Sequence, residues 1–200
     1  MSTPQVHLVD DDEAIRDALG WLLKSQGMPC IAYASAEAFL AAWTPALAGC
    51  LVLDMRMSGM SGLDCFDRLV EQNSTLPVIF LTGHGDVPLA VATLKKGAFD
   101  FFEKPFSDND LVARIGEAMA QDARQRAANA SADSLNARLA ALTGRERQIM
   151  ELVLAGKFNK VIADELNISM RTVEVHRANL FDKMQVKTAV ELANLLKPRR

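Results

Sequence analysis

The first 120 residues alternate five times between a short apolar run and an amphipathic stretch. Each apolar run holds four to six residues and ends at a polar or turn-forming residue, as buried strands do. Strands that alternate with helices predict a parallel sheet with helices on both faces. The predicted strands are 6–9, 30–33, 51–54, 77–82 and 98–103, and the predicted helices are 13–25, 36–43, 62–72, 87–96 and one from 108.

Length and composition leave room for a second, smaller domain and argue against a membrane protein. The chain has 200 residues, half of them apolar, which is enough for two cores. No apolar run approaches the roughly 18 residues of a membrane span, and the first residues lack the features of a signal peptide. We therefore expect a cytoplasmic protein with no membrane partner. The scattered Cys30, Cys50 and Cys65 are expected to be buried, outside any disulfide or metal site.

Charge is divided unevenly along the chain. Residues 1–120 contain eight Lys and Arg against sixteen Asp and Glu, whereas residues 143–200 contain eleven against seven. The two parts therefore carry net charges of −8 and +4, a difference that the overall charge of −3 hides. A basic C-terminal module is a first indication of nucleic-acid binding.

An alanine-rich segment, residues 121–140, separates the two parts and predicts a semi-rigid helical linker, because it contains no Pro or Gly. Leu135, Leu139 and Leu142 form a short apolar stripe that suits either a partner helix or the chain's own domains. The expected organisation is a domain over 1–120, the linker over 121–140 and a domain over 141–200.

The last part of the chain predicts four helices. Thr143 and Glu146 have the spacing of a capping box, which marks the start of the first helix. The tight turn between the second and third helices predicts a helix-turn-helix, a weak signal by itself. The four helices are expected to end at 154, 166, 184 and 196, and the last three to begin at 159, 170 and 188.

Polar side chains are expected to gather at one edge of the predicted sheet. The carboxyl ends of parallel strands meet at the same edge, and open α/β sheets bind ligands there. Three carboxylates, a hydroxyl and an ammonium would therefore share a pocket. They belong to Asp10 and Asp11 after the first strand, Asp54 after the third, Thr82 after the fourth and Lys104 after the fifth.

The acids Asp10 to Glu13 form an unbroken run after the first strand. Adjacent carboxylates raise one another's pKa unless a cation or a helix N-terminus compensates. Helix capping can use one or two of them, and a hard divalent cation could use the others.

These residues and their neighbours resemble the receiver domain of two-component response regulators, and the FixJ family in particular, over residues 5 to about 120. The resemblance implies a flavodoxin-like (βα)5 fold with a five-stranded parallel sheet. The phrases that carry it are Asp54-Met55-Arg56-Met57, Met60-Ser61-Gly62, Thr82-Gly83-His84-Gly85-Asp86-Val87-Pro88 and Glu103-Lys104-Pro105-Phe106.

The resemblance also implies a role for each residue of the predicted pocket. Asp54 would accept a phosphoryl group from a histidine kinase, Thr82 and Lys104 would sense the phosphate, and Phe101 would act as an aromatic switch. Asp11, Asp54 and the Arg56 carbonyl would bind Mg²⁺, with Asp10 holding a metal-bound water. Carboxylate attack on phosphorus needs such cations, because like charges must approach each other.

This chain departs from the family at one position of the loop after the third strand. Ser58 stands where the family usually has Pro, so a looser turn with intact chemistry is expected. Arg56 and His84 occupy two positions that often tune the lifetime of the phosphorylated form, which the sequence leaves open.

Residues 141–197 resemble the LuxR/NarL-type DNA-binding domain. The matching phrases are Leu142-Thr143-Gly144-Arg145-Glu146, Asn159-Lys160-Val161-Ile162-Ala163 and Thr172-Val173-Glu174-Val175-His176-Arg177. The resemblance places Glu174, Val175 and Ala178 toward the major groove, with Glu174 departing from relatives that have Lys. Candidate phosphate contacts are Lys160, Arg171, Thr172, Arg177 and Lys183, although some of these charges could simply face solvent.

The predicted function is that of a phosphorylation-controlled transcription factor. Its expected partners are a sensor histidine kinase, double-stranded promoter DNA and, on phosphorylation, a second copy of the chain, with RNA polymerase as a further candidate. The alternative is a phosphorylation-independent DNA-binding regulator whose receiver only dimerises. A haloacid-dehalogenase-type phosphohydrolase is disfavoured, because it needs a second Asp where this chain has Arg56. We therefore expect a regulator that catalyses no reaction beyond its own phosphorylation and slow dephosphorylation.

Overall fold

The computed structural model describes residues 3–83 and 87–197. Its contacts divide the chain into two compact units, Met1–Ala127 and Ala128–Arg200. No helix in the described ranges combines the length and apolar character that crossing a bilayer requires.

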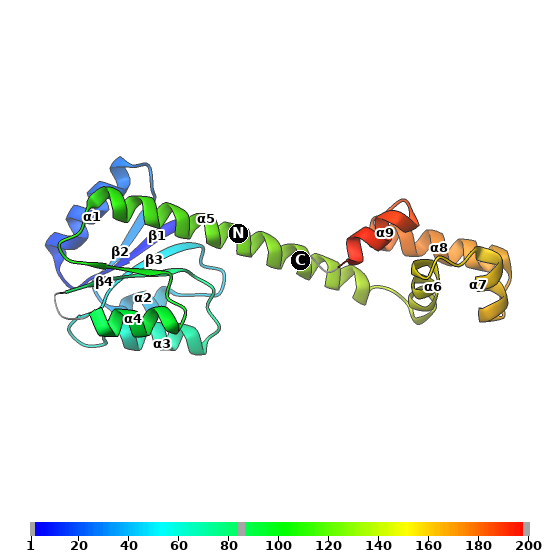
Figure 1. Cartoon of the computed structure of the whole chain (residues 1–200), viewed down its shortest axis with the longest axis horizontal. Helices are drawn as coiled ribbons and strands as arrows, with labels where there is room; N and C mark the ends of the chain where they lie inside the picture. Colours follow the sequence, from blue (N-terminus) through cyan, green and yellow to red (C-terminus); the bar gives the residue numbers. More distant parts are fainter. Residues whose placement is uncertain (1–2, 84–86, 198–200) are drawn as a thin grey trace. The chain divides into compact units, whose positions relative to one another are not determined.

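The first unit is built on a five-stranded parallel sheet with the order β2-β1-β3-β4-β5 (Figure 1). This confirms the predicted flavodoxin-like class, in which β1 and β3 are neighbours. β3 and β4 are buried along their whole length, which explains why they read as continuous apolar runs. The strands are β1 (Gln5–Val9), β2 (Cys30–Tyr33), β3 (Gly49–Asp54), β4 (Val78–Thr82) and β5 (Asp100–Glu103).

Four helices connect these strands and a fifth follows β5, and each begins at its predicted residue. Asp12 caps α1 by accepting from the Ala14 amide, so capping does use one member of the acidic run. The helices are α1 (Glu13–Ser25), α2 (Ala36–Ala42), α3 (Gly62–Glu71), α4 (Val87–Lys95) and α5 (Asp108–Ala140).

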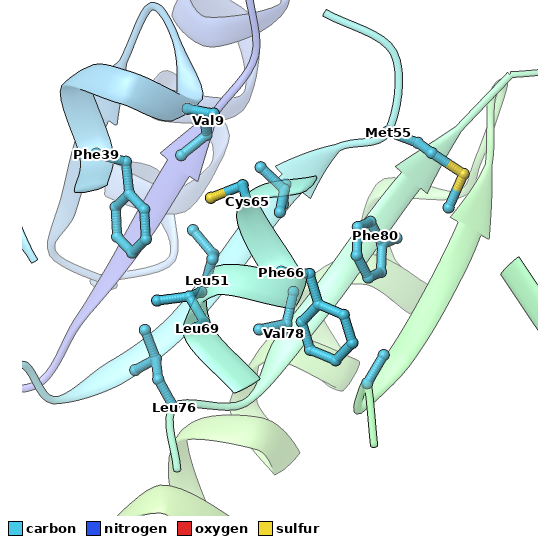
Figure 2. Close-up of a cluster of buried hydrophobic side chains, with 13 residues drawn as sticks. Val9, Phe39, Leu51, Met55, Cys65, Phe66, Leu69, Leu76, Val78 and Phe80 are labelled. Carbon is cyan, nitrogen blue, oxygen red and sulfur yellow. The ribbon is translucent and has the colours of Figure 1, made fainter. Parts of the chain in front are cut away.

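Apolar side chains form a separate core on each face of the sheet. Leu8 and Val52 point to one face, where Leu23 of α1 and Ile115 of α5 cover them. On the opposite face, Val9, Leu51, Val78 and Phe80 of the strands meet Phe39 of α2 and Cys65, Phe66 and Leu69 of α3, which Figure 2 shows together. Side chains that alternate along β1 therefore supply both cores. Cys50 and Cys65 are buried as predicted, but Cys30 is only half-buried because β2 is an edge strand; all three are free thiols.

Helix α5 continues through the segment predicted as a linker, and a buried ion pair ties part of this segment to the sheet. Asp122 is 1% exposed; it accepts from the Gly49 amide at 2.8 Å and pairs with Arg126 Nε at 2.8 Å. Arg126 also donates to the Leu47 carbonyl, in the loop before β3. The first compact unit consequently reaches Ala127.

The second unit packs four further helices on the end of α5. Its core contains Ile149, Val153, Ile162, Val173 and Leu180, with Leu142 buried and Leu135 and Leu139 half-buried against it. The leucine stripe therefore packs on the chain's own domain. The predicted capping box at Thr143 and Glu146 is present. The helices are α6 (Gly144–Leu154), α7 (Asn159–Leu166), α8 (Met170–Met184) and α9 (Ala189–Leu196).

Candidate functional site

The five predicted pocket residues lie at the carboxyl edge of the sheet. Asp54 and Thr82 are the last residues of β3 and β4, Asp10 and Asp11 follow β1, and Lys104 follows β5. Asp10, Asp54 and Thr82 are buried.

Three carboxylates of this edge form a compact oxygen cluster. One ligand oxygen each from Asp10, Asp11 and Asp54 lies within 4.8 Å of the others. Asp10 and Asp54 are 1% and 6% exposed, whereas Asp11 is exposed. Carboxylate oxygens are the donors that hard divalent cations prefer, so this set fits such an ion.

Lys104 links two of these acids. Its Nζ lies 2.7 Å from Asp54 Oδ1 and 2.9 Å from Asp10 Oδ2. Burial lowers the pKa of Lys104, but its hydrogen bonds to Asp54 and Asp10 outweigh that effect and raise the pKa above its usual value. Burial raises the pKa of Asp54; the hydrogen bond from Lys104 only partly offsets this effect, and the negative charge of Asp10 adds to it.

Backbone amides hold three further carboxylate oxygens of this cluster in place. The Arg56 amide donates to Asp54 Oδ2 at 3.1 Å, and the Ser58 amide donates to Asp11 Oδ2 at 2.7 Å. The Asp12 amide donates to Asp10 Oδ1 at 2.9 Å. Such bonds favour the ionised acid, and the Ser58 amide is the main reason why the pKa of Asp11 is lowered.

The predicted phosphate sensor and switch lie on β4 and β5. The Thr82 hydroxyl donates to the Gly83 carbonyl at 3.3 Å. Phe101 is half-buried against the core on the α3 side of the sheet, alongside Leu94 of α4. His84 lies outside the described residues.

Two residues of neighbouring elements support the site without having been predicted to do so. A Cβ on Gly62 would overlap the Asp54 carbonyl oxygen, so the absence of a side chain lets α3 start against the end of β3. Glu37 of α2 accepts from the Met60 amide at 2.9 Å. Gly62 lies inside a matched phrase, which was a usable signal, whereas nothing in the sequence marks Glu37.

In the second unit, α7 and α8 form the predicted helix-turn-helix, with a tight turn around Asn167 in the left-handed conformation. Val173, Leu180 and Met184 are fully buried, so the opposite side of α8 faces outward. The predicted DNA-contact residues there and on α7 are mostly exposed: Lys160, Arg171, Glu174, Val175 and Ala178 are exposed, and Thr172 is half-buried.

Two of the predicted phosphate contacts already have partners within the unit. Lys183 Nζ lies 2.7 Å from Oε2 of Glu146, which is only 3% exposed. The guanidinium of Arg177 donates to Asn159 Oδ1 at 2.8 Å and lies over the Phe181 ring. Both side chains therefore have a structural role as well as a candidate contact role.

Two family models match the chain. The response regulator receiver domain matches residues 6–116, and the luxR family of bacterial regulatory proteins matches residues 140–196.

Curated relatives resemble the chain over nearly its whole length. The transcriptional regulatory protein FixJ of Bradyrhizobium diazoefficiens is 46% identical over 95% of this chain and 93% of that protein. The C4-dicarboxylate transport transcriptional regulatory protein DctR of Rhodobacter capsulatus is 47% identical over 95% and 98%.

Two solved structures are similar over nearly the whole chain. The response regulator StyR is 39% identical with a TM-score of 0.94, and the alignment covers 98% of each chain. Full-length FixJ from B. japonicum is 45% identical with a TM-score of 0.60, covering 98% of this chain and 96% of that one.

Proposed function

The chain belongs to the response regulators that join a receiver domain to a LuxR-type DNA-binding domain and is a two-component transcriptional regulator of the FixJ type, in which we propose that Asp54 is the phosphoacceptor. The observation that carries this proposal is the position of Asp54, a buried carboxylate at the sheet edge with Lys104 Nζ 2.7 Å away.

The chemistry assigned to Asp54 is nucleophilic attack by its carboxylate on a phosphohistidine of a sensor kinase. The Asp54 O–P bond forms, the P–N bond breaks, and the leaving imidazole takes its proton from solvent. The Lys104 ammonium stabilises the charge that builds up on the phosphoryl oxygens. The amide of Arg56 keeps the carboxylate oriented through its other oxygen.

The same edge is proposed as the Mg²⁺ site of the receiver. Asp11, Asp54 and the carbonyl of Arg56 would hold the ion, with Asp10 binding through a water. The ion, when bound, supplies positive charge that allows a carboxylate and a phosphoryl group to approach each other.

Phosphorylation is proposed to reach the rest of the molecule through Thr82 and Phe101. A phosphoryl group on Asp54 adds acceptor oxygens that draw the Thr82 hydroxyl away from the Gly83 carbonyl, and Phe101 moves into the space that Thr82 leaves. This remodels the surface of α4 and β5, including Val91, which is 42% exposed. We propose that two receivers pair through this surface.

Dimerisation would bring two helix-turn-helix units to one inverted repeat. Binding of the second half-site then becomes intramolecular, which raises the overall affinity. In this proposal Glu174, Val175 and Ala178 contact bases, while the cationic residues of α7 and α8 contact phosphates. RNA polymerase remains a candidate partner of the promoter-bound dimer.

Labelled phosphate from a small acyl phosphate donor, with MgCl₂, tests the phosphoacceptor. The wild-type chain should acquire an acyl-type phosphate, and Asp54→Asn should acquire none, since an amide is not a nucleophile. Asp17→Asn, which removes an exposed carboxylate of α1, is the matched control. Label on Asp54→Asn at the wild-type level would reject the assignment.

Sedimentation with and without a phosphoryl mimic, alongside DNA footprinting, tests the dimerisation step. The proposal predicts a monomer that becomes a dimer and protects half-sites about one helical turn apart. A chain that stays monomeric yet gains DNA affinity would instead show that phosphorylation releases the DNA-binding unit from the receiver. Equal DNA binding with and without phosphate would favour the phosphorylation-independent alternative.

A further inference from the structure

Backbone N–H groups of residues 56–62 hold the loop between β3 and the start of α3. Two of them donate to carboxylates of the pocket, one donates to Glu37 of α2, and one closes the loop on its own Met55 carbonyl. The pairs are Arg56 to Asp54 Oδ2 at 3.1 Å, Ser58 to Asp11 Oδ2 at 2.7 Å, Met60 to Glu37 Oε1 at 2.9 Å and Gly62 to the Met55 carbonyl at 3.2 Å.

The Ser58 bond differs from the others because it joins the loop to an exposed acid of the oxygen cluster. Asp11 follows β1 and is 47 residues away in the sequence. Asp10 and Asp54 are confined by burial and by Lys104, whereas an exposed aspartate is free to change rotamer. The short bond from Ser58 is therefore a specific restraint on the Asp11 carboxylate, and the lowered pKa of Asp11 has the same bond as its main cause.

This restraint depends on the residue type at position 58. Proline has no backbone N–H and cannot make the bond. This chain has Ser at position 58, so a backbone N–H is present to make the bond. The Asp11 restraint is thus a property of this chain that a Pro-containing receiver cannot share.

We propose that the backbone amide of Ser58 is a positioning group for the metal site, holding Asp11 beside Asp10 and Asp54 so that Mg²⁺ binds more tightly. The inference rests on the proposed Mg²⁺ site. A carboxylate has two oxygens and about four lone pairs, so Asp11 can keep the Ser58 bond while it ligates a cation. Hydrogen bonds that orient metal ligands typically change metal affinity by about 10- to 100-fold.

Two substitutions at one position separate the amide from the side chain. Ser58→Pro removes the N–H, while Ser58→Ala keeps it and removes only the hydroxyl. Titration of the full chain with MgCl₂, monitored through amide NMR shifts, gives the Mg²⁺ affinity of each variant. Ser58→Pro should bind Mg²⁺ about ten-fold more weakly than wild type, at the low end of the range for such bonds. The Mg²⁺ affinity of Ser58→Ala should stay within about three-fold of wild type, because this variant keeps the backbone N–H that orients Asp11.

Phosphorylation kinetics provide a second readout. The Mg²⁺ concentration for half-maximal labelling should rise in Ser58→Pro, while the rate at saturating Mg²⁺ stays near that of Ser58→Ala. A loss of maximal rate with unchanged Mg²⁺ dependence would contradict a role in metal positioning.

Hydrogen exchange offers a measurement that does not depend on the Pro variant folding. Hydrogen exchange at the Ser58 amide should be slower than in Asp11→Ala and should remain slow when MgCl₂ saturates the site. Faster exchange on adding MgCl₂ would show that the ion and the amide compete for Asp11. Competition, or equal or tighter Mg²⁺ binding by Ser58→Pro, would overturn the inference.

Asp11→Ala also separates failure of this inference from failure of the proposed site. If Asp11→Ala binds Mg²⁺ as wild type does, the metal site itself is misassigned. If Asp11→Ala loses Mg²⁺ binding while Ser58→Pro and Ser58→Ala have the same Mg²⁺ affinity, the metal site is correct and only the role of the Ser58 amide is wrong.

Discussion

The receiver edge and the helix-turn-helix use charge in opposite ways. At the receiver edge, Asp10 and Asp54 are buried and share the half-buried ammonium of Lys104, so the three charges are held in one cluster. On α7 and α8, Lys160 and Arg171 are exposed. Coupled buried charges suit chemistry on a single phosphoryl group, whereas separate exposed charges suit a long polyanion such as DNA.

We expect the largest effect when Lys104, the cation that Asp10 and Asp54 share, is removed. Lys104→Ala leaves Asp10 and Asp54 without their shared ammonium and a bound phosphate without its partner. Mg²⁺ should still bind, but phosphorylation should no longer raise DNA affinity, a loss of about ten-fold or more in the response. Gel-shift titrations with and without phosphodonor measure this. Lys96→Ala, which breaks an exposed pair with Asp67, should leave the response intact.

A second buried charge of the receiver, Asp122, attaches α5 to the first residue of β3. Asp122→Ala leaves the Gly49 amide without its acceptor and removes the carboxylate that pairs with Arg126, while Arg126 keeps its bond to the Leu47 carbonyl. Leaving a buried amide unsatisfied costs about 1–3 kcal/mol of unfolding free energy. Urea unfolding of the receiver signal measures the loss, and hydrogen exchange in α5 after residue 120 should rise with it. Asp133→Ala, farther along α5 and exposed, is the control. Unchanged exchange would mean that the ion pair does not anchor the helix.

The exposed cations predict additive changes in the salt dependence of DNA binding. Four cations are candidate phosphate contacts: Lys160, Arg171, Arg177 and Lys183. If all four contact phosphates, a dimer neutralising about eight phosphates has a slope of log K against log salt near −7. Lys160→Ala and Arg171→Ala should each flatten this slope by about 1.8, since each removes two contacts from the dimer. A slope that none of the four substitutions changes would remove these residues from the DNA surface.

Lys183 is a cation of α8 that pairs with a buried carboxylate, as Lys104 does in the receiver. Lys183→Ala leaves the buried Glu146 carboxylate without its ion-pair partner. We expect the second unit to lose about 1 kcal/mol of stability, in addition to any change in the salt slope. Thermal unfolding of the Lys183→Ala and Lys160→Ala chains separates the two effects, and equal melting curves would show that the Glu146 pair is dispensable.

The last prediction concerns a buried titratable group of the receiver that lies away from the charged edge. Burial lowers the pKa of His7 below its usual 6.5, with a smaller opposing contribution from the Ala48 backbone. The unfolded chain therefore binds a proton that the folded chain excludes, and stability falls as the pH drops below about 6.5, by at most about 1.4 kcal/mol per pH unit. Urea titrations between pH 5 and 7 should show a shallower pH dependence in His7→Leu. The same slope in both chains would contradict this.

Local patterns determined much of the architecture. The alternation of apolar runs and helical stretches predicted the parallel sheet, and the Thr143 and Glu146 spacing predicted the start of α6. These features depend on residues close together in the chain. For the same reason, the strand-end acids Asp10 and Asp54 could be expected at one edge, because their position follows from strand direction alone.

Only the tertiary structure decided which groups bind one another across elements. Glu37 accepts from the Met60 amide, Asp122 secures the start of β3, and Lys183 pairs with Glu146, over separations of 23, 73 and 37 residues. Local sequence patterns do not encode such pairs, because they depend on how helices pack on the sheet or on each other. The Ser58 amide is the clearest case. The sequence shows that position 58 has a backbone N–H, because its residue is Ser and not Pro. Its acceptor, Asp11, becomes apparent only when β1 and β3 lie side by side.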